Sequence, residues 1–273
     1  MLHLLTLTWN ACDKLTKLKE SLLPCLEGIE YKWLIRDNAS VDDTFEVASQ
    51  WGDKVKVFKH KNNLDNFSQG MNFLFNEADA KEGDYILLLN NDVTFGDTSS
   101  IKKMIKIMEK DTEVGVVGAR LLFTGTDKIQ HCGVVFQPRY QLPMHFRSKE
   151  VSDANAEKDR LFQVVTGAVL LTKAEYFKNS FDNTSGTKGM DENYHWAFDD
   201  VDLCLSIGMN QKKKIVYCGG TKIFHEESAS LKKNPANRLY MNHNINYFKK
   251  KWLTKYDNDL EVYSKNAKYK LYK

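Results

Sequence analysis

The stretch Tyr85-Ile-Leu-Leu-Leu-Asn-Asn-Asp92 is an unbroken apolar run that ends abruptly in three polar residues. Such a run, rich in Ile and Leu, is typical of a strand buried in a parallel sheet. Open α/β sheets bind ligands just beyond the carboxyl ends of these strands, and Asp92 offers the hard oxygen ligand that Mg²⁺ or Mn²⁺ prefers. Taken alone, the stretch predicts only a strand followed by a turn, because Asn and Asp are ordinary turn residues.

The composition is that of an ordinary globular protein. Of 273 residues, 42% are hydrophobic and 27% are charged, which is sufficient for a sizeable core and excludes the composition of a disordered chain. The five cysteines form no C-x-x-C pair, so we expect reduced thiols in a cytoplasmic protein. The first residues lack a basic segment and a cleavage site, and no apolar run approaches membrane-spanning length. We therefore expect a soluble protein, or one that lies peripherally at the inner face of a membrane.

Strand and helix patterns alternate through the first half of the chain. We expect strands over 2–8, 33–36, 54–58, 85–89 and 115–121. We expect helices over 14–26 with Asp13 as N-cap, from Asp42-Asp43 onward, and over 69–78 and 101–108. This order predicts one doubly wound, Rossmann-like sheet, mostly parallel and twisted, with helices on its faces.

The alternation breaks after about Thr124. We expect strands over 131–136, 162–171 and 214–218, and helices over 200–208 and 235–252. Polar residues predict a loop over 147–160, and a stretch rich in Gly, Asn and Asp predicts a loop near the site over 182–194. The second half is therefore expected to hold a smaller β region, followed by C-terminal helices.

Polar side chains follow three of the predicted parallel strands: Asn10, Asp37-Asn38-Ala39-Ser40 and Asn90-Asn91-Asp92. Parallel strands share one carboxyl edge, so these clusters are expected to line a common crevice. The chain contains no G-x-x-x-x-G-K-[ST] motif and no G-x-G-x-x-G after its first strand. Phosphate-loop and dinucleotide-binding enzymes are therefore disfavoured.

Two further motifs lie in the second half of the chain. Asp199, Asp200 and Asp202 open a predicted helix, where the helix dipole explains one or two carboxylates. Three neighbouring carboxylates raise one another's pKa, which favours the use of one as a general base. His225 follows an apolar strand, so we weigh a metal-ligand role against a structural one.

The order of these pieces resembles glycosyltransferase family 2, a family of inverting enzymes with the GT-A fold, and most nearly its rhamnosyltransferase-like and galactofuranosyltransferase-like branch. The matching segments are Leu7–Asn10, Arg36–Asp42, Asn63–Asn72 with Gly70, Leu87–Val93, Val165–Leu171, Phe198–Leu205 and Ile223–His225. The resemblance implies a nucleotide-sugar-binding half over 1–123, an acceptor and catalytic half over 124–233, and a C-terminal helix with a basic tail over 234–273.

The resemblance implies roles for the donor-side residues. Asp37 would hydrogen-bond the nucleotide base, with Asn10, Asn38, Ser40 and Asn63 completing the donor site. The implied donor is a UDP- or dTDP-sugar.

A divalent ion, Mn²⁺ or Mg²⁺, is implied by the D-x-D position, which reads Asn90-Asn-Asp92 here. Asp92 would ligate the ion that bridges the donor diphosphate, and His225 would be a further ligand or a diphosphate contact. Asn90 would face ribose or sugar hydroxyls. The bound ion acts as a Lewis acid as the nucleoside diphosphate leaves.

The catalytic base of the family corresponds to Asp200, with Asp199 as its close rival. The resemblance also implies that Gly167 and Ala168 let backbone pass near the donor sugar or acceptor. Trp196 is a candidate to stack on a sugar ring, although core packing explains such residues as well.

The implied activity is metal-dependent, inverting transfer of a sugar to an acceptor hydroxyl, with a bacterial surface glycan as the acceptor that the family favours. The segment 249–273 carries eight Lys among interleaved Trp and Tyr residues. This tail is as typical of contact with an anionic surface or nucleic acid as of a solvated terminus. Two alternatives therefore stay open: transfer to an unusual acceptor such as modified DNA, and a non-catalytic nucleotide-sugar- or carbohydrate-binding module on the same fold. The sequence does not indicate an oligomeric state.

Overall fold

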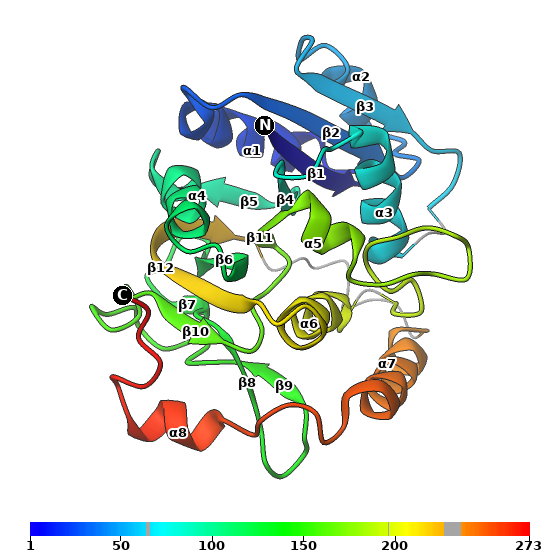
Figure 1. Cartoon of the computed structure of the whole chain (residues 1–273). Coiled ribbons are helices and arrows are strands. Elements are labelled where there is room, and N and C mark those ends of the chain that lie inside the picture. The colour runs from blue at the N-terminus through cyan, green and yellow to red at the C-terminus, as the bar shows by residue number, and fades with distance from the viewer. Residues whose placement is uncertain (64–65, 196, 227–235) are drawn as a thin grey trace.

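A computed structural model describes the chain except residues 64–65, 196 and 227–235, and for 236–238 it describes the backbone alone (Figure 1). The strands are β1 (Leu2–Thr8), β2 (Tyr31–Asp37), β3 (Val55–Lys59), β4 (Tyr85–Leu89), β5 (Val93–Phe95), β6 (Val114–Phe123), β7 (Ile129–His131), β8 (Val134–Phe136), β9 (Pro143–His145), β10 (Arg160–Phe162), β11 (Val169–Lys173) and β12 (Lys214–His225). The α-helices are α1 (Cys12–Leu22), α2 (Thr44–Ala48), α3 (Phe67–Ala78), α4 (Ser100–Lys110), α5 (Ala174–Lys178), α6 (Asp199–Leu205), α7 (Ala236–Trp252) and α8 (Leu260–Lys265).

One large sheet runs through the molecule in the order β10-β12-β6-β11-β4-β1-β2-β3, with β5 added to β12 and β7 to β6. Strands β3, β2, β1 and β4 are parallel neighbours, as expected for the first half of the chain. Strand β11 is antiparallel to both β4 and β6, while β12 returns parallel to β6. The sheet is therefore mixed but mostly parallel, and the predicted α/β fold is confirmed.

Alternating side chains of the central strands enter two cores, one on each face of the sheet. On β4, Leu87 and Leu89 pack with α1 and α4, whereas Ile86 and Leu88 pack with α3, α5 and α6. Figure 1 shows these helices on the two faces. Gly70 lets α3 approach the sheet closely, because a Cβ there would lie 2.5 Å from the Leu7 side chain.

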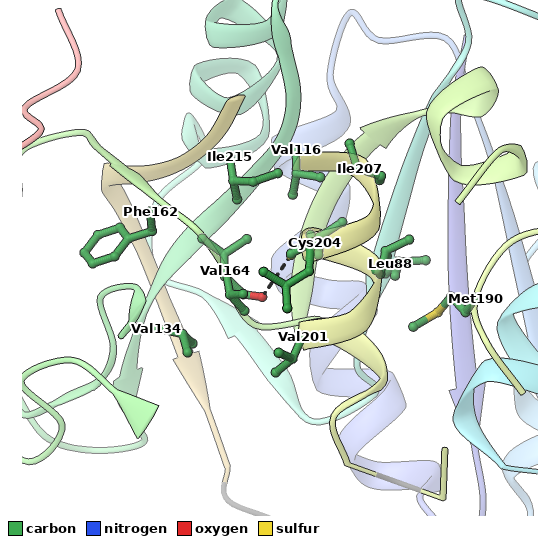
Figure 2. Packing of buried hydrophobic residues seen from close by; sticks show 14 of the residues in the cluster. Leu88, Val116, Val134, Phe162, Val164, Met190, Val201, Cys204, Ile207 and Ile215 are labelled. Carbon is green, nitrogen blue, oxygen red and sulfur yellow. Dashed lines mark hydrogen bonds between the residues drawn. The ribbon is translucent and has the colours of Figure 1, made fainter. Parts of the chain in front are cut away.

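Helix α6 is held against the sheet by apolar side chains along one side. Figure 2 shows Val201 and Cys204 of α6 on the side of the helix toward Val164, and Ile207, in the π-helical turn Ser206–Asn210 that follows α6, toward Val116; all of them are buried in the same core. The Cys204 Sγ donates to the Val165 carbonyl at 3.5 Å. The first turn of α6, with its aspartates, is therefore fixed relative to the central strands.

Some predicted boundaries were wrong. The helix expected over 14–26 begins at Cys12 and ends as a 3₁₀ turn over Leu23–Leu26, with Ala11 at the N-cap in place of Asp13. The strand expected over 131–136 divides into β7 and β8, which belong to different sheets, since Gly133 interrupts it with a φ of 102°. The strand expected over 162–171 likewise divides into β10 and β11.

The C-terminal segment packs against the second half of the chain. Trp252, Tyr256 and Tyr263 are buried, and Leu271 pairs with Arg160 beside β10. These three aromatic residues are therefore part of the core, whereas Tyr269 and Tyr272 are half-buried and lysines such as Lys255 and Lys265 are exposed. Within the described ranges, no helix has the length and apolarity needed to cross a bilayer.

Candidate active site

The carboxyl ends of β1, β2 and β4 meet at one edge of the sheet because the strands are parallel and in register. A cavity of about 440 Å³ opens there. Its lining includes, from the predicted set, Asn10, Asn38, Asn63, Asn90 and Asp92, with Lys14 in addition. The predicted common crevice is therefore present.

Asp37 is fully buried and does not itself line this cavity, although the adjacent Asn38 does. Its Oδ1 accepts hydrogen bonds from the backbone N–H and the hydroxyl of Ser40, and the Ser40 Oγ in turn accepts from the Asn10 N–H at 2.8 Å. The Asp37 Oδ2 has no hydrogen-bond partner among the described residues. A buried acceptor without a donor costs free energy, so this oxygen is suited to accept an N–H from a ligand.

Antiparallel pairing of β5 with β12 brings His225 to Asp92, since His225 pairs with Val93 and the Glu226 N–H donates to the Asp92 carbonyl at 3.0 Å. The His225 Nε2 lies 3.0 Å from the Asp92 Oδ1. Its Nδ1 lies 2.6 Å from the Gln130 Oε1, which can only accept, so Nδ1 carries the hydrogen.

With its hydrogen on Nδ1, the His225 ring directs Nε2 at a carboxylate oxygen. Two acceptors at this distance attract each other only when a proton or a cation lies between them. An imidazole nitrogen beside a carboxylate oxygen suits Mn²⁺ better than Mg²⁺, which prefers oxygen ligands alone. Within the described part of the chain no group of three or more His, Cys, Asp and Glu side chains is placed to hold a metal, and Asp92 and His225 are the candidate ligands at this edge of the sheet.

A second cavity, of about 590 Å³, adjoins the first and shares Phe67 and Asn90 with it. The antiparallel β4–β11 pair creates the junction, because the Asn90 N–H donates to the Ala168 carbonyl at 2.9 Å just before β11 begins. Besides these residues the lining includes Gly167, Asp199, Asp200 and His225, together with Val134, Pro143, Met144, His145, Phe198 and Met241.

Two backbone N–H groups hold the Asp200 carboxylate. Gly167 donates to its Oδ2 at 2.8 Å, and Val201 donates to its Oδ1 at 2.8 Å. A Cβ on Gly167 would lie 3.0 Å from the Asp200 Cβ, so the absence of a side chain permits this approach. Phe198, at the start of α6, has a φ of 71°, a costly conformation for a non-glycine residue that packing must maintain.

Asp199 differs from Asp200 in its environment. It is buried, and burial together with the adjacent Asp200 raises the pKa of Asp199 to about 7. Asp202, the third carboxylate, points elsewhere: its Oδ1 accepts from the Trp252 Nε1 at 2.6 Å and lies 2.8 Å from the Lys251 Nζ. Asp202 thus anchors α7, and its role is structural.

The structure adds residues that the sequence patterns did not identify. Lys14 lies in the first cavity with its Nζ 3.4 Å from the Glu226 Oε1. Gln130 fixes His225, and His145 lines the second cavity. Lys14 could have been found from the sequence, because it lies in the helix that directly follows β1. Gln130 and His145 lie in short strands whose sequences show no recognisable pattern. Trp196, predicted to stack on a sugar, lies outside the described residues.

Comparison with protein families matches residues 4–156, more than half of the chain, to glycosyl transferase family 2. The chain belongs to glycosyl transferase family 2. No curated protein sequence matches it.

Solved structures resemble this family 2 chain along most of its length. A crystal structure of GalNAc-T7 with UDP, GalNAc and Mn²⁺ has a TM-score of 0.66 at 11% identity, covering 98% of this chain and 51% of that one. S. aureus TarS has a TM-score of 0.60 at 12% identity, with 94% and 40% covered. The mannosyltransferase PcManGT from Pyrobaculum calidifontis, in complex with GDP-Man and Mn²⁺, has a TM-score of 0.58 at 12% identity, with 84% and 57% covered.

These neighbours share the GT-A fold with this chain, as the sequence motifs predicted. The chain spans about half the length of the structures it matches.

Proposed function

We propose that the protein is an inverting, divalent-metal-dependent glycosyltransferase that moves a sugar from a nucleotide-diphosphate-sugar to an acceptor hydroxyl. The observation that carries the proposal is the pair of adjoining cavities that meet at Asn90. Asp92 lines the first cavity and its partner His225 lines the second, so a pair suited to a metal ion lies where the cavities adjoin, and the second cavity also holds Asp200, a carboxylate suited to act as a base.

The first cavity receives the nucleotide. Asp37 Oδ2 accepts an N–H of the base. Asn10, which follows β1, and Asn38 and Ser40, which follow β2, shape the base site together with Asn63. A pyrimidine nucleotide, as in a UDP- or dTDP-sugar, supplies such an N–H. The motifs resemble most nearly those of the rhamnosyltransferase-like and galactofuranosyltransferase-like branch of the family.

Asp92 and His225 would hold the divalent ion beside the donor diphosphate. When bound, the ion supplies Lewis-acid stabilisation of the charge on the departing diphosphate. Lys14 offsets further negative charge by exchanging its contact with Glu226 for a phosphate oxygen. Asn90, at the junction, faces the hydroxyls of the transferred sugar.

Asp200 removes the proton of the acceptor hydroxyl. As that oxygen forms a bond to the anomeric carbon from the far side, the bond from this carbon to the diphosphate oxygen breaks and its electron pair leaves with the nucleoside diphosphate. One displacement inverts the anomeric configuration. Asp199 is the weaker candidate, because its carboxyl group is buried, whereas that of Asp200 is only half-buried and more accessible to an acceptor hydroxyl.

A bacterial surface glycan is the acceptor that the family resemblance favours. Transfer to modified DNA predicts instead that acceptor binding weakens steeply with salt. A non-catalytic binding module on this fold predicts nucleotide binding without turnover, but retention of the paired carboxylates in the second cavity favours the enzyme.

A donor screen tests the proposal. Nucleoside diphosphate release and thermal shift are followed across UDP-, dTDP- and GDP-sugars, with Mn²⁺ and with chelator. Saturating donor at 100 times its Kd stabilises a folded protein by about 2.7 kcal/mol, or roughly 5–10 °C at this size. We expect this shift with Mn²⁺ only, its loss in Asp92→Ala, and its retention in the exposed control Asp127→Ala. Equal shifts with Mn²⁺ and with chelator would contradict the metal site.

A further inference from the structure

A buried histidine lies beside the acceptor-side cavity, and its proton position follows from its contacts. His131, at the end of β7, is fully buried, and its Nε2 accepts from the backbone N–H groups of Gly133 and Thr166, both at 3.3 Å. Burial, assisted by the nearby His145, holds the pKa of His131 well below its ordinary value, so the ring is neutral. With Nε2 accepting, the single hydrogen of His131 is on Nδ1.

The hydrogen on the His131 Nδ1 determines which ring nitrogen of the neighbouring His145 carries a hydrogen. The His131 Nδ1 lies 2.9 Å from the Nδ1 of His145, on β9. Since His131 donates, the His145 Nδ1 accepts, and the hydrogen of the His145 ring is therefore on Nε2. His145 is exposed and lines the cavity that contains Asp199 and Asp200.

The same backbone segment, Thr166–Gly167, orients both His145 and Asp200 in that cavity. Thr166 donates its N–H to His131, and the next residue, Gly167, donates its N–H to Asp200. His145 and Asp200 are therefore held by consecutive peptide groups, one through His131 and the other directly. The pairing of β8 with β9 further fixes His145, because Val134 pairs with it.

We infer that His145 binds the acceptor by donating its Nε2–H to an oxygen of a saccharide, and that His131 is the positioning residue that fixes the His145 tautomer. The inference rests on the proposed function. It implies that the molecule receiving the sugar carries a second oxygen, next to the reacting hydroxyl, that can accept a hydrogen bond from His145. Asp200 receives the proton of that hydroxyl while His145 holds a neighbouring oxygen of the same sugar.

Long-range ¹H–¹⁵N NMR of the histidine rings in the full chain tests the tautomers. We expect the hydrogen of His131 on Nδ1 and that of His145 on Nε2. The sample then receives UDP with Mg²⁺, which avoids the paramagnetism of Mn²⁺, and afterwards the methyl glycosides of glucose, galactose and rhamnose. At least one glycoside is expected to shift the His145 ring signals. A hydrogen on His131 Nε2, or no His145 shift with any of these glycosides, would overturn the inference.

Substitutions separate the positioning role from a general structural role. His145→Gln keeps an acceptor for His131 and a donor for the saccharide, whereas His145→Leu keeps neither. For the glycoside that binds, we expect His145→Leu to raise the acceptor KM about tenfold, the effect of one lost hydrogen bond, and His145→Gln to restore it within about threefold. His131→Gln, which can accept two N–H groups and donate to His145, is expected to resemble the wild type more closely than His131→Leu does.

Lys149→Gln, an exposed change in the loop after β9, is the matched control and should leave the acceptor KM unchanged. Equal KM values for His145→Leu and His145→Gln would refute the inference. Failure of the proposed function gives a different result, because the amide signals of Asn10 and Asn90 would then not respond to UDP and Mg²⁺ in the same NMR sample.

Discussion

Asp199→Asn is expected to stabilise the protein at neutral and alkaline pH. Asp199 is buried next to Asp200, and these surroundings raise its pKa from 3.8 to about 7, burial being the larger cause. A raised carboxyl pKa means that the folded state keeps a proton that the unfolded state has already lost. The stability that depends on the neutral form is therefore complete below pH 3.8 and is lost as the pH rises to about 7.

The size of the effect follows from the interval between 3.8 and about 7. Each pH unit corresponds to 1.36 kcal/mol, so Asp199 alone lowers the free energy of unfolding by ~4 kcal/mol at pH 8 relative to pH 3.8. Asparagine has a similar shape and no charge, and its Oδ1 can still accept from the Asp200 N–H, which lies 3.0 Å from the Asp199 Oδ1.

Urea unfolding at pH 5.0, 6.0, 7.0 and 8.0 measures this difference. We expect the stability of Asp199→Asn relative to the wild type to increase with pH over this range and to level off above about pH 7. Asp53→Asn, a change at an exposed aspartate, serves as control and should show no such increase. A variant that is less stable than the wild type at pH 8, or a difference independent of pH, would refute the account of the Asp199 environment.

Three further results are expected. Gly167→Ala should lower kcat by about 10- to 100-fold, because the added Cβ lies 3.0 Å from the Asp200 Cβ and disturbs a charge-assisted hydrogen bond worth ~1.5–3 kcal/mol; steady-state kinetics that match the wild type would contradict this. Gln130→Leu removes the acceptor that orients His225 and should weaken Mn²⁺-dependent nucleotide binding about 10- to 100-fold in calorimetry, whereas unchanged affinity would argue against the metal site. Lys251→Met leaves two buried carboxylates without their cation and should destabilise the fold by ~3–5 kcal/mol in urea unfolding, a claim that fails if the loss is below ~1 kcal/mol.

The first half of the fold was predictable because its long strands carry strong patterns. The runs 2–8 and 85–89 are apolar and end in polar clusters, and parallel pairing brings those clusters together at one edge. Asp92 could be found for the same reason, since it directly follows a strand of this kind.

The second half was less predictable because its strands are short and their partners are distant in sequence. Strand β5 has three residues, and no local pattern indicates that it pairs with the end of β12. The proximity of His225 to Asp92 depends on that pairing, so the motifs suggested a metal role for His225 while its geometry required the structure. The sequence also could not show that Asp199, Asp200 and Asp202 have different roles, because Asp202 forms an ion pair with Lys251, about fifty residues further along the chain.

The most direct test of the account is a comparison of Asp200→Asn with the wild type in two measurements, sugar transfer and binding of the nucleoside diphosphate with Mn²⁺. Loss of a general base typically costs 10²–10⁴-fold in rate. The account predicts that kcat falls by at least about 100-fold while the Kd for nucleoside diphosphate stays within about twofold. A variant that retains transfer within a few-fold of the wild type would contradict the assignment of Asp200 as the base.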